Sequence, residues 1–122
     1  MAPKRYDIPI TVDALGDAIA YTPVLSGRLA QIHYVKQDFD DGVDFLITSE
    51  ATGLILWDED DVNSAAIRAP RLLICDTAGE AQLYSLGLGV YEAQIVLAND
   101  RVKIVVASGG DKTTANFHVV ME

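Results

Sequence analysis

The sequence predicts an all-β domain, a sandwich or small barrel of about eight or nine strands. Most short runs alternate apolar and polar residues with a period of two, which is typical of strands with one buried face. Gly, Pro, Asp and Asn separate these runs. The chain has 122 residues, half of them hydrophobic, which is enough for one core. We therefore expect one domain over residues 6–122, preceded by a flexible arm at residues 1–5.

The first strand is expected over residues 6–12, where Tyr6, Ile8, Ile10 and Val12 share one face. Pro9 interrupts this run and has no N–H to donate to a neighbouring strand. The strand is therefore predicted to lie at the edge of a sheet.

The remaining strands follow from the same alternation. The run 28–36 carries apolar residues on both faces, which predicts a central strand covered on both sides. Turn residues at Asn99–Asp100 and Gly109–Asp111 predict a hairpin over residues 100–120. Further strands are expected at 43–48, 101–106 and 115–122, and less regular apolar runs lie at 18–22, 53–57, 65–74 and 93–97.

One segment has a different pattern. Thr77–Glu80 fits a capping box, in which the first and last side chains each bond a backbone N–H at a helix start. Residues 81–86 suit a helix, and Gly87 or Gly89 can end it. The sequence thus predicts one short helix near residues 77–87.

The net charge of −9 argues against a protein that binds nucleic acid or an anionic membrane, because both need clustered Lys and Arg. The longest stretch without charge, residues 81–91, is about half as long as a membrane-spanning helix. Residues 37–62 hold nine acidic side chains and no Lys or Arg, so the whole excess charge lies there. We expect this acidic edge to face solvent and the partner-binding surface to lie elsewhere.

Acidic side chains in the two clusters of residues 37–62 are candidates for a Ca²⁺ site, since Ca²⁺ binds clustered oxygen ligands. Their spacing does not match an EF-hand loop, and solvated turns explain them as well. Trp57 precedes the second cluster, which leaves a glycan-binding surface as another alternative. The Ca²⁺ candidates are Asp38, Asp40, Asp41, Asp58 and Asp60.

No motif of catalysis or cofactor binding is complete. Gly87–Glu92 lacks the third Gly of a dinucleotide loop, and Gly109–Thr113 lacks the Gly that precedes Lys in a phosphate loop. His33 and His118 have no second metal ligand at a suitable spacing. Cys75 stands alone among apolar neighbours, which favours a buried thiol in a protein made in a reducing cytoplasm. We expect no enzyme and no cofactor.

Several sequence segments resemble those of small structural proteins of tailed bacteriophages. These segments combine turns and strands and together cover most of the chain. They are Tyr21–Val24 with Ser26–Arg28; Gly42–Phe45 followed by Thr48, Glu50, Thr52, Gly53 and Trp57; Asp76–Gly79 with Leu83–Tyr84; and Asn99–Val105 through Gly109–Gly110 to Phe117–Val119.

The resemblance implies a virion component built on a jelly-roll-like β-sandwich, a capsid decoration or cement protein that bridges neighbouring major capsid subunits. Such proteins commonly assemble as homotrimers. A tail, neck or baseplate protein would have the same sequence features. The expected partner contact is strand addition at the basic start of the chain. The residues assigned to this contact are Lys4, Arg5, Tyr6 and Ile8.

Overall fold

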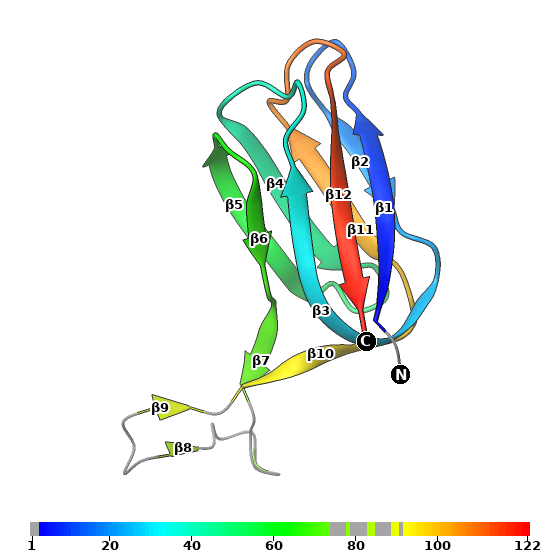
Figure 1. Ribbon diagram of the computed structural model, residues 1–122, viewed down its shortest axis with the longest axis vertical. Helices are drawn as coiled ribbons and strands as arrows, with labels where there is room; N and C mark the ends of the chain where they lie inside the picture. The colour runs from blue at the N-terminus through cyan, green and yellow to red at the C-terminus, as the bar shows by residue number, and fades with distance from the viewer. Residues whose placement is uncertain (1–2, 74–77, 79–82, 85–88, 91) are drawn as a thin grey trace.

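The computed structural model describes residues 3–73, 78, 83–84, 89–90 and 92–122, and in these residues two antiparallel sheets pack face to face (Figure 1). The predicted all-β sandwich is confirmed. The short strands of two or three residues bring the number of strands in the described residues to twelve, above the expected eight or nine. The described residues contain no helix with the length and apolar character needed to cross a bilayer.

The larger sheet has the order β1-β12-β3-β10-β7, with β6 also paired to β3. The smaller sheet has the order β2-β11-β4-β5, and β8 pairs with β9 in a separate ribbon. The strands of the larger sheet are β1 (Lys4–Thr11), β12 (Thr114–Met121), β3 (Leu25–Val35), β10 (Glu92–Asp100), β7 (Arg71–Leu73) and β6 (Ala66–Arg68). The others are β2 (Ala18–Tyr21), β11 (Val102–Ala107), β4 (Val43–Ser49), β5 (Ile55–Val62), β8 (Leu83–Tyr84) and β9 (Gly89–Val90).

Aromatic rings from both sheets meet at the centre of the core. The ring centroid of Phe45 on β4 lies 4.6 Å from that of Tyr34 on β3 and 4.9 Å from that of Phe117 on β12, in edge-to-face geometry. All three side chains are almost fully buried. This arrangement adds to the burial energy of the rings and holds the sheets in one relative position.

The central position predicted for residues 28–36 is confirmed, since β3 pairs with β12 on one side and with β10 and β6 on the other. Its cover on both faces is not. Ile32 and Tyr34 face the core, whereas Gln31 on the opposite face is exposed. A bulge opposite Val120–Met121 shifts the register, so Leu29 and Ala30 are both buried although they are consecutive.

The predicted hairpin over residues 100–120 is wrong. β11 pairs with β2 and β4, whereas β12 pairs with β1 and β3 in the opposite sheet. The backbone of the connecting loop bonds to other loops: Gly109 N–H donates to the carbonyl of Gly16, and Asp40 N–H donates to the carbonyl of Gly109. The turn residues therefore carry the chain from one sheet to the other.

The short helix predicted near residues 77–87 is not present in the described part of that segment. Leu83–Tyr84 form β8 and pair with Gly89–Val90, while residues 77, 79–82 and 85–88 lie outside the described residues. A helix of about nine residues is marginal without a packed apolar face, so a local capping signal does not decide the structure. At the start of the chain, β1 begins at Lys4, so the arm expected over residues 1–5 does not include Lys4 and Arg5.

Candidate partner-binding edge

β1 is the edge strand of the larger sheet, as Pro9 predicted. Val12 N–H donates to the carbonyl of Thr113, which fixes the side on which β1 bonds to β12. Every second residue before Val12 therefore directs its backbone N–H and C=O groups to β12. These residues are Ile10, Ile8, Tyr6 and Lys4. The N–H and C=O groups of Arg5, Asp7 and Thr11 consequently face the free edge. Pro9 belongs to this outward set, and its missing N–H leaves a gap in the row of free donors.

The residues of the expected partner contact divide between two faces of β1. Lys4 and Arg5 are exposed, Tyr6 is half-buried against the core, and Ile8 is buried at 8% exposure. Strand addition at this edge would therefore use backbone groups and the outward side chains, whereas Ile8 contributes to the core.

A polar row crosses the outer face of the larger sheet next to this edge. Asp7 lies opposite His118, and His118 lies opposite His33. Asp7 Oδ1 is 2.9 Å from Arg5 Nε and 3.4 Å from His118 Nε2, while His33 Nε2 is 2.8 Å from Gln31 Oε1. Because the residues are far apart along the chain, the sequence alone did not place the two histidines together.

An apolar row crosses the outer face of the smaller sheet. Ile19, Val105 and Leu46 lie directly opposite one another on three adjacent strands. Ile19 is 60% exposed and Leu46 is 38% exposed, although a solvent-facing sheet surface is normally polar. This outer apolar row was missed from the sequence, because it becomes visible only when the strand pairings are known.

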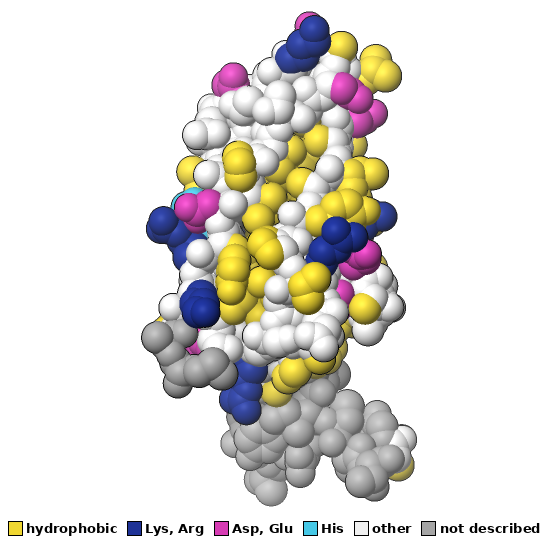
Figure 2. Space-filling view, turned by 90° about the vertical axis from the view of Figure 1, so that its right-hand side faces the viewer, with side chains coloured by type: hydrophobic (Ala, Val, Ile, Leu, Met, Phe, Trp, Pro, Cys, Tyr) yellow, Lys and Arg dark blue, Asp and Glu magenta, His cyan; other side chains and the backbone are white. Residues whose placement is uncertain are grey.

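The two long sides of the sandwich differ. β5 and β6 lie along one side, and β1 and β2 lie along the other (Figure 1). On the first side Arg68 of β6 pairs with Glu59 of β5 at 2.6 Å and lies 5.2 Å from the centre of the Trp57 ring, so it links the sheets. On the second side hydrophobic side chains run along the surface (Figure 2).

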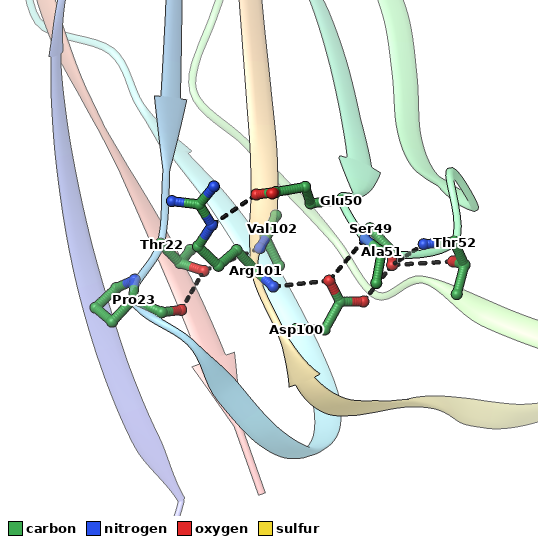
Figure 3. A network of polar contacts seen from close by, with 9 residues as sticks. All are labelled: Thr22, Pro23, Ser49, Glu50, Ala51, Thr52, Asp100, Arg101 and Val102. Atoms are coloured by element: carbon green, nitrogen blue, oxygen red, sulfur yellow. Dashed lines mark hydrogen bonds and ion pairs between the residues drawn. The ribbon is translucent and has the colours of Figure 1, made fainter.

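A buried polar network anchors the end of the smaller sheet (Figure 3). Asp100 is 6% exposed and accepts hydrogen bonds from the Ser49 hydroxyl, from Ala51 N–H at 2.9 Å and from Arg101 N–H at 2.7 Å. Burial raises the pKa of Asp100, but these three donors outweigh burial and hold the pKa below its ordinary value. Both carboxylate oxygens are occupied, so the network is structural.

The acidic side chains proposed for Ca²⁺ do not converge. No group of three or more His, Cys, Asp or Glu side chains among the described residues is arranged to hold a metal ion. Asp38 accepts from the backbone and hydroxyl of Thr114, and Asp41 pairs with Lys36. Asp58 and Asp60 lie on β5, whereas Asp38, Asp40 and Asp41 lie in the loop between β3 and β4.

Trp57 does not offer a surface for stacking a sugar ring. Its side chain is 5% exposed, and its indole N–H donates to Glu59 at 3.0 Å. The hydrogen bond from Trp57 and the guanidinium of Arg68 both lower the pKa of Glu59, and together they outweigh the effect of burial, which raises it. Cys75, for which the sequence predicted a buried thiol, lies outside the described residues.

Two shallow hollows accompany these surfaces. A hollow of about 480 Å³ lies between β10 and the β4–β5 turn, with apolar walls that include Leu54, Leu72 and Ile95. A second, of about 420 Å³, lies beside β2 and β11 next to Ile19. The first hollow adjoins Asp100 and Ser49. Their side chains bond to each other, and Asp100 also accepts from neighbouring backbone, so the Asp100 carboxylate is not available as a general acid or base in this hollow.

Comparison with known proteins assigns no family. The chain matches no protein-family model, and no curated protein is similar to it in sequence. A solved structure described as "Crystal Structure of FLHE" aligns over 100% of this chain and 99% of that chain, with 8% sequence identity and a TM-score of 0.44. Likeness at this level assigns neither a fold family nor a function.

Proposed function

We propose that this protein is a non-enzymatic structural component of a phage virion, a capsid decoration protein that bridges neighbouring major capsid subunits. The observation that carries the proposal is the outer edge of β1, which pairs with no other strand among the described residues and presents backbone donors and acceptors beside an apolar side of the sandwich. Addition of a partner strand to such an edge satisfies these groups and provides affinity through main-chain hydrogen bonds. The resemblance of these sequence segments to phage structural proteins supplies the assembly, a virion, in which this edge would take up a partner strand.

A bridging protein needs two separate contact surfaces, and the sandwich offers a second one. The outer apolar row of Ile19, Val105 and Leu46 lies on the smaller sheet, whereas β1 belongs to the larger sheet. Burial of exposed aliphatic side chains against a capsid subunit would contribute about 25 cal/mol for each Å² removed from water. The edge and the row are thus two separate surfaces, and two different partner chains can contact them at once.

Mass spectrometry of purified virions tests the proposal. We expect this chain to be present at a copy number in the hundreds, because a decoration protein covers a whole capsid. A copy number near six or twelve would assign it to the tail, neck or baseplate, and its absence from the virion would overturn a structural role.

Cosedimentation with capsids assembled without this protein tests the second surface. Ile19→Asp should reduce capsid binding by about tenfold or more, since it places a charge in the proposed apolar contact. Ile67→Asp is the matched control, because Ile67 is 57% exposed on the other sheet. Equal binding by the two variants would exclude the outer apolar row as a contact.

A further inference from the structure

We propose that the partner strand at β1 is β1 of a second copy, paired antiparallel across a two-fold axis that passes beside Tyr6. This inference rests on the proposed function, which places a partner at this edge, and it names that partner. The contact is isologous, because each copy offers the same edge and receives the same edge.

The first support is the supply of backbone groups. In an antiparallel pair, a residue directs its N–H and C=O to the same side, and residues facing each other exchange both bonds. Arg5 and Asp7 have such outward groups on the free edge of β1. Pairing Arg5 with Asp7 of the second copy, and Asp7 with Arg5 of the second copy, forms about four main-chain hydrogen bonds.

The second support is that the two prolines select this register. Pro3 and Pro9 lie on either side of the segment 4–8. When Arg5 faces Asp7 of the second copy, Pro9 faces Pro3 of the second copy. The two residues without an N–H therefore face each other, and neither prevents a hydrogen bond at another position. A shift of the pairing by two residues would place Pro9 opposite Arg5 or beyond the free segment.

The third support is charge. Arg5 and Asp7 project from the outer face with side-chain exposures of 61% and 45%. In the proposed register each guanidinium lies opposite a carboxylate of the other copy, at two symmetric positions. The neighbouring registers would place Asp7 opposite Asp7 or Arg5 opposite Arg5, and like charges directly opposite destabilise a sheet.

The fourth support comes from the inner face. In this register Tyr6 faces Tyr6 of the second copy in a pair that lacks hydrogen bonds, where opposite side chains approach most closely. Tyr6 is half-buried and packs against the core, at the side where hydrophobic side chains reach the surface (Figure 2). A second copy would cover this ring and extend the apolar contact across the axis.

Charge reversal with mixing tests the pairing in the full chain. Arg5→Asp alone and Asp7→Arg alone should each raise the dimer dissociation constant by about tenfold or more, measured by analytical ultracentrifugation. An equimolar mixture of the two variants should recover association as a heterodimer, because each introduced charge then faces its opposite. Mixing cannot restore the ion pair within one strand, so failure of the mixture to associate would overturn the proposal.

Disulfide cross-linking tests the axis. In a Cys75→Ser background, Tyr6→Cys should form a disulfide-linked dimer on mild oxidation, because Cα atoms of a non-hydrogen-bonded pair lie about 4.5 Å apart. Thr11→Cys, near the far end of β1, is the matched control and should remain monomeric on a denaturing gel. Cross-linking of Thr11→Cys in preference to Tyr6→Cys would refute the register.

The mass in solution separates this inference from the proposed function. A dimer mass by light scattering supports the two-fold contact, and a trimer mass, as the resemblance implies, would overturn it. A chain that stays monomeric yet binds capsids would remove the self-association and leave the virion role intact. Dimers that fail to bind capsids would support the two-fold contact and remove the virion role.

Discussion

Asp100 joins two turns that are distant in sequence, because its carboxylate accepts from Ser49 at the end of β4, from Ala51 in the turn that follows, and from Arg101 after β10. Asp100→Ala removes the acceptor and leaves the buried Ser49 hydroxyl and two part-buried N–H groups without it, at a cost of about 1–3 kcal/mol in the free energy of unfolding. Urea denaturation followed by circular dichroism measures this loss. Asp58→Ala, at an exposed position, should change stability by less than about 0.5 kcal/mol; equal losses in both variants would contradict the structural role of Asp100.

The pH dependence of stability provides a second test at this residue. The pKa of Asp100 is lowered from 3.8 in the folded state, so its ionised form stabilises the fold above the unfolded-state pKa. That contribution is lost as the pH falls through the folded-state pKa. The stability difference between the native chain and Asp100→Asn should therefore shrink as the pH falls below 3.8. A difference that is constant or grows in acid would show that the charge of Asp100 is not what stabilises the network.

Other residue-level expectations depended on contacts that a sequence does not contain. Trp57 stands beside acidic residues in the chain, yet its ring is buried under Arg68 of another strand. His33 and His118 are 85 positions apart, but the register of β3 and β12 makes them direct neighbours. Local spacing could exclude known motifs, whereas it could not show which side chains the sheet brings together.

At the scale of elements, Gly27 determines how β3 meets the end of β12. Its φ of +132° is rarely adopted by other residues, and an added Cβ would lie 2.7 Å from the carbonyl oxygen of Glu122. Arg28 and Glu122 exchange both backbone hydrogen bonds at this point, which limits any shift. Gly27→Ala should lower the unfolding free energy by about 2 kcal/mol or more.

Gly53→Ala is the matched control for this substitution. Gly53 also has a positive φ, +74°, but an added Cβ would meet no atom within 4 Å. It should therefore cost only the backbone strain, about 1–2 kcal/mol. Thermal unfolding of both variants under one set of conditions measures the contrast, and a Gly53→Ala loss as large as that of Gly27→Ala would show that the clash with Glu122 is relieved.

Strand existence could be predicted because alternation is a local property, and the edge position of β1 could be predicted because Pro9 lacks a donor. Sheet membership could not. β11 and β12 both have a buried face and are joined by turn residues, so a hairpin and a crossover between sheets give the same pattern. The outer apolar row was hidden for the same reason, since its residues come from three strands.

At the scale of the whole molecule, the two sides of the sandwich have different roles. The β5–β6 side contains the edge strand β5, acidic side chains and the Arg68–Glu59 pair, whereas the β1–β2 side contains the edge strands β1 and β2 and surface hydrophobic groups. Acidic side chains on an edge strand discourage unwanted strand pairing. The charge is thus placed away from the edge to which we assign the partner.

This separation predicts that acidic residues of β5 can be neutralised without loss of assembly. The variant Asp58→Asn/Asp60→Asn/Asp61→Asn removes three of the net nine negative charges. Asn tolerates the φ of 56° at Asp61, and Glu59 is kept because it pairs with Arg68. The variant should retain its mass in light scattering and its binding to capsids, whereas Arg5→Asp on β1 should weaken association. If neutralising β5 abolished association while Arg5→Asp did not, the partner-binding edge would lie on the β5 side of the sandwich.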